Sequence, residues 1–188
     1  MTLMQLEWPQ RKPLALPANF LMPSKAKLSR WLYLVVALIA ITVDQFTKNL
    51  AIASLELGTS YPVIGEILSW RLLYNDSAAF GLGFGYTWIL AVISFAAALA
   101  TIWFSRRLTS VSWSLMIGVF LGGVVGNLID RLIREPSFGN GHVVDFIQIP
   151  FNFPIFNLAD IFIVSMASLS VLRVMRGEYL GGIEPKQK

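Results

Sequence analysis

Two aspartates near the C-terminal end of the chain lie in the setting that most directly indicates chemistry. Asp145 lies between Val144 and Phe146, and Asp160 directly precedes an apolar stretch with a helical pattern. An ionised carboxylate in apolar surroundings is costly unless it is paired or hydrogen-bonded. Two nearby carboxylates that cannot both ionise form an acid/base pair. The pattern therefore predicts hydrolysis of the aspartyl type at the edge of a membrane.

Each aspartate also has an explanation that requires no catalysis. Asp145 could be a solvated residue in a turn of an outer loop. Asp160 follows Asn157 by three residues, which is the pattern of an N-cap residue with an acid in the first helical turn. A helix N-terminus also holds a carboxylate in place, so the capping and catalytic roles of Asp160 are compatible.

Polar residues at the end of an earlier apolar stretch are candidates for orienting the reacting groups. Asn127 and Asp130 are three residues apart and share a helical face, and Arg131 follows them. The alternative is polar capping of a helix end near the lipid head groups, with Arg131 extending to the interface. Gly122 and Gly126 have the G-x-x-x-G spacing that lets another helix approach closely, which is a packing role.

Three further polar residues are candidates for supporting roles. Asp44 and Lys48 are four residues apart with the acid first, the favoured order for an ion pair on a helix. Charged residues within a membrane span are functional candidates by default, although a structural ion pair near the outer interface explains these two equally well. Asn75 begins a segment of small residues and could donate a hydrogen bond to a bound peptide backbone.

Composition indicates a membrane protein. Of 188 residues, 55% are hydrophobic and 14% are charged, against roughly 25% charged in soluble domains. The chain has no cysteine and one histidine, which excludes a cysteine nucleophile, a disulfide and a site built from several histidines. We expect no metal and no organic cofactor. The net charge of +4 comes mostly from basic residues beside apolar stretches, so we expect membrane orientation and no nucleic-acid partner.

Hydropathy predicts four transmembrane helices of roughly 20 residues, the length that crosses a bilayer. They cover approximately residues 31–54, 86–104, 113–133 and 156–175. Between the first two spans, residues 61–64 and 67–74 have the pattern of short strands around a Gly-Glu turn. Residues 134–155 also have the composition of strand and turn. The predicted fold is an all-α bundle of four transmembrane helices with a small β-sheet at its outer face.

The distribution of basic residues predicts the orientation. Eleven of the 15 basic residues fall in the N-terminal segment, the 105–112 loop and the C-terminal segment, so both termini are predicted to be cytoplasmic. The candidate site then lies at the outer face. We expect residues 1–30 to be a flexible cytoplasmic extension, 31–175 to be the four-span domain and 176–188 to be a cytoplasmic tail.

Taken together, five segments resemble the lipoprotein signal peptidase (signal peptidase II) family and occur in the family's order. They are DQFTK (44–48), NDSAAF (75–80), GNLIDR (126–131), GHVVDFI (141–147) and FPIFNLAD (153–160). Each segment alone is weakly specific. Five in order on a four-span chain form a highly specific pattern that extends over nearly all of residues 31–175.

The resemblance implies an aspartyl endopeptidase of the bacterial inner membrane. It implies cleavage of the signal peptide from diacylglyceryl-modified prolipoproteins before the lipidated cysteine, with Asp145 and Asp160 as the catalytic pair. The expected partners are lipidated prolipoproteins and membrane lipids, and we expect a monomer. The family's supporting or substrate-binding positions correspond to Asp44, Lys48, Asn75, Asn127, Asp130, Arg131 and Asn157.

The alternative function is a small proton-coupled membrane transporter or a lipid-binding protein, because intramembrane Asp and Lys also suit a proton relay. A relay predicts charged residues spread through the depth of the membrane, whereas here they gather at one face. An inverted repeat, typical of transporters, is not evident in the sequence. The Gly-x-Gly-Asp motif of another class of intramembrane aspartyl proteases is absent.

Overall fold

The computed structural model describes residues 25–76 and 87–182. Three parts of the predictions lie outside the described residues: residues 1–24 of the predicted 1–30 extension, most of the NDSAAF segment, and residues 183–188 of the predicted tail. The elements, in chain order, are α1 (Lys25–Ser54), β1 (Ser60–Ile64), β2 (Leu68–Asn75), α2 (Thr87–Ser105), α3 (Val111–Ile133), β3 (Val143–Gln148), α4 (Leu158–Met175) and the short 3-10 helix η2 (Leu180–Gly182).

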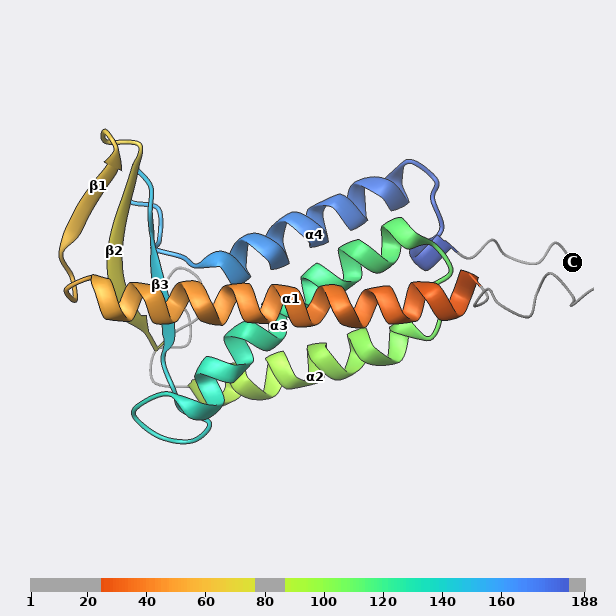
Figure 1. The fold of residues 1–188 in the computed structure, drawn as a ribbon, viewed down its shortest axis with the longest axis horizontal. Coiled ribbons are helices and arrows are strands. Elements are labelled where there is room, and N and C mark those ends of the chain that lie inside the picture. Colours follow the sequence, from red (N-terminus) through yellow and green to blue (C-terminus); the bar gives the residue numbers. More distant parts are fainter. Residues whose placement is uncertain (1–24, 77–86, 183–188) are drawn as a thin grey trace, which may run out of the picture.

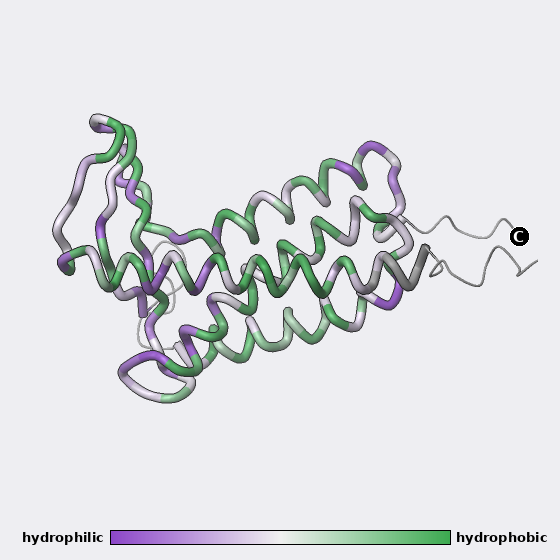
Figure 2. The backbone as a smooth tube through the Cα atoms, viewed as in Figure 1, coloured by the Kyte–Doolittle hydropathy of each residue, from purple (hydrophilic) through white to green (hydrophobic). Residues whose placement is uncertain are grey.

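Four helices are long and apolar enough to cross a membrane, which confirms the predicted spans. They are Trp31–Ser54, Thr87–Ser105, Val111–Ile133 and Leu158–Met175, and each bound lies within two residues of the predicted one. Apolar residues follow the helices, while hydrophilic residues gather at the loops and at the end that carries the sheet (Figure 2). The bilayer explains this division, because a span must satisfy its backbone internally and present apolar side chains to lipid.

Helix α3 is the central element of the bundle. In its most apolar stretch of 18 residues, 61% of α3 is buried, against 28% in α1, 17% in α2 and 6% in α4. Helix α3 also contacts all three other long helices. Its glycines allow this packing. A Cβ atom on Gly122 would lie 2.3 Å from the Cβ of Ala40 in α1, and one on Gly123 would lie 2.6 Å from the carbonyl oxygen of Ala159 in α4. The predicted close approach of helices at the glycines is therefore present.

A three-stranded antiparallel sheet lies at one end of the bundle, and η2 and the start of α1 lie at the opposite end (Figure 1). β1 and β2 form the predicted hairpin between the first two spans. The third strand, β3, comes from the segment between α3 and α4 and pairs with β2, with Leu73 opposite Asp145 and Asn75 opposite Val143. Strand β3 thus connects the sheet to the last two spans.

Candidate active site

Strand β3 places Asp145 in the interior at the end of the bundle that carries the sheet. Its neighbours Val144 and Phe146 belong to a buried apolar cluster with residues of α1 and β2, and Asp145 itself is 2% exposed. The Asp145 carboxylate accepts two hydrogen bonds, from Asn75 Nδ2 at 2.7 Å and from Asn157 Nδ2 at 2.6 Å. Pairing of β2 with β3 therefore brings Asn75 to Asp145 from 70 residues away in the chain.

The first turn of α4 fixes Asp160. Asn157 is the N-cap, its side chain accepts from the Asp160 backbone N–H, and the Asp160 carboxylate accepts from the Asn157 backbone N–H, both at 3.1 Å. This capping box satisfies two backbone donors of the helix end. Asn127 of α3 also donates through Nδ2 to Asp160 Oδ1 at 2.8 Å. The carboxylate thus accepts two hydrogen bonds, one from the backbone N–H of the N-cap residue and one from Asn127 of α3.

Hydrogen bonds of two asparagines, Asn157 and Asn127, connect Asp145 to Asp160. Asn157 Nδ2 donates to Asp145 Oδ1 at 2.6 Å and to Asn127 Oδ1 at 3.2 Å, while Asn127 Nδ2 donates to Asp160. Each amide thus has its oxygen and nitrogen assigned by its partners. The two carboxylates, 15 positions apart in the sequence and carried by a strand and a helix, belong to one continuous hydrogen-bond network.

The electrostatic setting favours a proton on Asp145. Burial, and after it the negative charge of Asp160, raises the pKa of Asp145 from 3.8 to about 7. The hydrogen bonds from Asn75 and Asn157 and the charge of Lys48 oppose this shift but do not cancel it. Near neutral pH the Asp145 carboxyl can therefore hold and release a proton.

A fully buried cluster of three charged side chains contacts Asn127. Lys48 Nζ lies 2.9 Å from Asp44 Oδ2 and 2.8 Å from Asp130 Oδ2, and all three side chains are fully buried. The third donor of Lys48 reaches Asn127 Oδ1 at 2.8 Å. The predicted ion pair between Asp44 and Lys48 is present, and Asp130 joins it from α3. Buried charges require such pairing because removing them from water is costly.

Each of the two buried acids also accepts a backbone N–H. Asp44 Oδ1 accepts from Ala159 N at 3.0 Å, and Asp130 Oδ2 accepts from Val144 N at 3.2 Å. Gly126 leaves the space for Asp44, since a Cβ atom there would lie 2.4 Å from Asp44 Oδ2. The acids therefore bind α4 and β3 at the backbone as well as Lys48.

The structure adds residues that the sequence analysis did not include in the site. Arg134 Nε donates to Asp130 Oδ1 at 2.7 Å, and its Nη2 donates to Asn49 Oδ1 at 3.1 Å. Gln45 Nε2 donates to Asp130 Oδ1 at 3.1 Å. Arg134 follows Asp130 by four residues, the same ion-pair spacing that identified Asp44 and Lys48, so the sequence did contain a signal for it.

Arg131, a predicted site residue, has a different kind of environment. Its Nη1 donates to the backbone oxygen of Asn127 at 3.3 Å, and its Nε is buried without a hydrogen-bond partner in the described part of the chain. The guanidinium lies within electrostatic range of Asp160, Asp145 and Asp130. A buried donor without a partner is costly, which makes Arg131 a candidate for binding an oxygen atom of a ligand.

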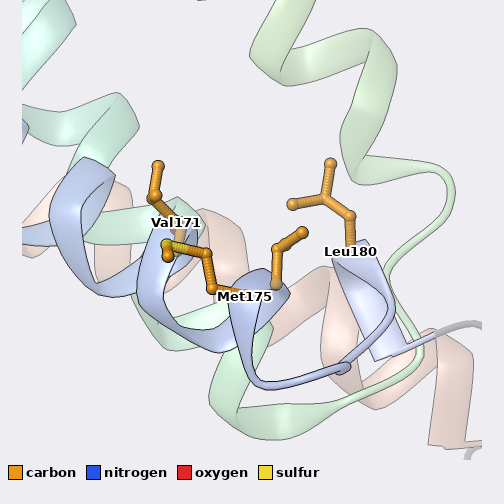
Figure 3. Close-up of a pocket in the computed structure, with 5 residues that line it drawn as sticks. Val171, Met175 and Leu180 are labelled. Carbon is orange, nitrogen blue, oxygen red and sulfur yellow. The ribbon is translucent and has the colours of Figure 1, made fainter.

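All nine predicted site residues thus lie in one network, Arg131 through the backbone of Asn127 only. A separate apolar pocket lies at the opposite end of the bundle, between the last turns of α4 and η2 (Figure 3). Its lining is Ser170, Val171, Val174, Met175 and Leu180. None of the predicted site residues contributes to it, so the candidate site is defined by the polar network.

Comparison with known proteins gives consistent matches. The model of the family described as signal peptidase (SPase) II matches residues 36–176. The lipoprotein signal peptidase of Leifsonia xyli subsp. xyli is 41% identical over 169 residues, which is 88% of this chain and 78% of that protein. The lipoprotein signal peptidase of Mycobacterium leprae is 43% identical over 141 residues, covering 75% and 70% of the two chains.

Two solved structures have the same fold. A bacterial membrane enzyme determined by the in meso method at 2.3 Å resolution matches with a TM-score of 0.70 and 25% identity, over 83% of this chain and 94% of that one. A second structure, described in the same words at 1.9 Å resolution, matches with a TM-score of 0.67 and 26% identity, over 77% and 92%.

Proposed function

The chain belongs to the signal peptidase II family of membrane aspartic peptidases, and on that premise we propose that it cleaves signal peptides from diacylglyceryl-modified prolipoproteins. Cleavage takes place before the lipidated cysteine. The relatives are named for lipoprotein processing. The observation that carries the proposed chemistry is the hydrogen-bond network that joins Asp145 to Asp160. Asn157 donates to Asp145 and to Asn127, and Asn127 donates to Asp160.

In the proposed mechanism the dyad holds one proton and activates one water molecule. Asp160, ionised, accepts a proton from the water as the water oxygen attacks the scissile carbonyl carbon. Asp145, protonated, donates to the carbonyl oxygen as this oxygen becomes negative. The raised pKa of Asp145, about 7, supports this distribution of the proton.

Collapse of the tetrahedral intermediate completes the reaction. The carbon–nitrogen bond breaks, and the leaving amine nitrogen takes the proton that Asp160 received. Asp145 recovers its proton from the hydroxyl group of the intermediate, so the dyad returns to its starting state with one proton. The products are a carboxylic acid on the signal peptide and a free amine on the lipidated cysteine.

The remaining polar groups have supporting roles in this proposal. Asn157, Asn127 and Asn75 orient the two carboxylates through the hydrogen bonds described above. Arg131 uses its buried Nε, which has no hydrogen-bond partner among the described residues, to bind a carbonyl oxygen of the substrate. The three-stranded sheet holds the extended peptide next to Asp145 by backbone hydrogen bonding, the mode by which exposed strands bind peptides.

The membrane setting of the reaction follows from the distribution of charge. We place both termini in the cytoplasm and the dyad at the outer face of the cytoplasmic (inner) membrane, because eleven of the 15 basic residues belong to the N-terminal segment, the 105–112 loop and the C-terminal segment of the sequence. The acyl chains of the substrate stay in the bilayer while the peptide bond reaches the dyad. The protein acts as a monomer with membrane lipid around its spans.

The decisive experiment is cleavage of a lipidated prolipoprotein by purified protein in lipid. Wild type is compared with Asp145→Asn and Asp160→Asn, and we expect each variant to lose at least about 1,000-fold in kcat, because each removes an acid or base from the reaction. Glu178→Gln, a carboxyl-to-amide change in an ion pair at the opposite end of the bundle, is the matched control and retains activity.

Three outcomes would contradict the proposal in different ways. Near-full activity of either aspartate variant would remove that residue from the dyad. Cleavage at another bond would change the assigned substrate. No cleavage by wild type, with the protein folded and the substrate lipidated, would refute the proposed activity.

A further inference from the structure

Lys48 pairs with two acids and also donates to an asparagine, so charge pairing alone does not explain its contacts. It is fully buried, and its three donors go to Asp44, Asp130 and Asn127. An ammonium group has three donors, so its hydrogen-bonding capacity is fully used by side chains of α1 and α3. None of these hydrogen bonds is with Asp145 or Asp160, so Lys48 acts on the dyad through its charge, which lowers the pKa of Asp145, and through the groups that it holds.

The first contact leads to α4. Asp44 binds Lys48 through Oδ2 and the backbone N–H of Ala159 through Oδ1. Ala159 is fully buried and directly precedes Asp160. The link from Lys48 through Asp44 therefore fixes the backbone one residue before one member of the dyad.

The second contact leads to β3 in the same way. Asp130 binds Lys48 and the backbone N–H of Val144 through Oδ2. Val144 is fully buried and directly precedes Asp145. The two links are equivalent: in each, an acid accepts the N–H of the residue before a dyad aspartate, and Lys48 connects the two acids.

The third contact sets the direction of an amide. Asn127 Oδ1 accepts from Lys48 and from Asn157, so Asn127 Nδ2 must point to Asp160. Without the ammonium group, Asn127 Oδ1 keeps only the longer hydrogen bond from Asn157 at 3.2 Å, so the direction of the Asn127 amide is less firmly fixed. A reversed amide would place an oxygen against the carboxylate of Asp160, which is repulsive.

We infer that Lys48 is a positioning residue that sets the separation of the two dyad carboxylates, by joining the acid that holds α4 at Ala159 to the acid that holds β3 at Val144. The inference rests on the proposed function, since it assigns Asp145 and Asp160 as the reacting pair. It predicts that loss of Lys48 lowers the rate of the chemical step and leaves substrate binding largely intact, because the substitution removes no group of the sheet and does not remove Arg131.

The test uses a variant that keeps the buried charges balanced. Lys48→Met with Asp44→Asn removes one positive and one negative charge and retains an oxygen for Ala159 N. We expect a folded protein with KM close to wild type and kcat about 100-fold lower, the loss typical of small misplacement of reacting groups. Arg173→Met with Glu178→Gln is the matched control, because it also removes one positive and one negative charge, from an ion pair at the opposite end of the bundle, and it keeps most of the kcat.

A distance measurement separates positioning from general destabilisation. The chain has no cysteine, so spin labels can be placed at two introduced cysteines, at Ile64 in the sheet and Leu169 in α4, which are 57% and 45% exposed. We expect one narrow distance distribution in wild type and in the control with Arg173→Met and Glu178→Gln, and a broadened or shifted one in the variant with Lys48→Met and Asp44→Asn.

Every result decides the inference. Unchanged kcat in the variant with Lys48→Met and Asp44→Asn overturns it, as does a loss of kcat with the wild-type distance distribution. If this variant does not fold, Lys48→Gln is used, which is too short to reach both acids, and failure of both to fold assigns Lys48 to stability and overturns the inference. If wild type does not cleave the substrate, the proposed function fails, whereas the distance distributions still report whether Lys48 holds α4 relative to the sheet.

Discussion

The side chain of Asn157 makes hydrogen bonds to three residues, because its amide has both an acceptor oxygen and a donor nitrogen. Its oxygen accepts from the backbone of Asp160 and thereby caps α4, while its nitrogen donates to Asp145 and to Asn127. A carboxylate at this position could make the cap but not the two donations. The capping explanation and the proposed catalytic role of Asp160 are thus compatible, because the helix end that forms the cap also holds the Asp160 carboxylate in place.

The protonation of Asp145 gives a prediction for the pH dependence of cleavage. The pKa of Asp145 is raised to about 7 mainly by burial and then by Asp160, and the proposed mechanism needs a proton on this carboxyl. We therefore expect kcat/KM to fall as the pH rises through about 7, measured on the lipidated substrate across pH 5 to 9.

Substitution of Asn75 should shift the pH at which kcat/KM falls. The hydrogen bond from Asn75 stabilises the ionised form and so lowers the pKa of Asp145, and Asn75→Ala should move the fall in kcat/KM to higher pH. A fall at unchanged or lower pH in Asn75→Ala would show that another group sets the alkaline limit.

At the scale of the elements, α3 determines both the packing of the bundle and the position of the charge cluster. Gly118, Gly122 and Gly126 lie at intervals of four residues on the face that meets α1. At Gly118 an added Cβ would lie 2.8 Å from the carbonyl oxygen of Tyr33, whereas at Gly126 it would lie 2.4 Å from the carboxylate of Asp44. In the interface between α1 and α3, Gly118 therefore contributes to helix packing alone, whereas Gly126 also leaves space for a residue of the site network.

This difference predicts contrasting effects of the same substitution. Gly126→Ala should displace Asp44 from Lys48 or from Ala159 N and lower kcat by about 10- to 100-fold, the range seen when groups that orient a site are removed. Gly118→Ala should cost about 1–3 kcal/mol of stability through overpacking but leave kcat near wild type. Thermal unfolding and single-turnover cleavage of both variants measure these quantities. Equal losses of kcat would contradict a specific connection between Gly126 and the site.

At the scale of the whole molecule, the chain is divided into a membrane-spanning body and a polar end that carries the sheet (Figures 1 and 2). The network of Asp145 and Asp160 lies at the sheet end, and the loop between α2 and α3 lies at the other end with η2. This arrangement suits a substrate whose acyl chains are held in the bilayer and whose scissile bond lies at the membrane surface.

The proposed orientation predicts which exposed positions can be labelled from outside. Phe138, which is 81% exposed near the sheet, and Tyr179, which is 51% exposed near η2, can each be changed to cysteine in this cysteine-free chain. A membrane-impermeant maleimide applied to intact spheroplasts should label Phe138→Cys, and should label Tyr179→Cys only after the membrane is opened. Labelling of Tyr179→Cys in intact spheroplasts would reverse the proposed orientation.

The sequence by itself determined the features that depend on local pattern. The four spans follow from hydropathy because a bilayer requires long apolar helices, and the hairpin of β1 and β2 follows from two short strand patterns around a turn. The cap of α4 follows from the spacing of Asn157 and Asp160, because both partners lie within one helical turn. The pair of Asp44 and Lys48 is predictable for the same reason.

Only the tertiary structure decided which of these local features meet. Residues 44 and 159 are joined by a hydrogen bond across 115 positions, and residues 75 and 145 across 70 positions. Periodicity states which face of an element is apolar but not which element covers it. The pairing of β3 with β2 and the ion pair between Asp130 of α3 and Lys48 of α1 could therefore not be derived from spacing. The close approach of α1, α3 and α4 at glycine brings these groups together, and that approach exists only in the packed bundle.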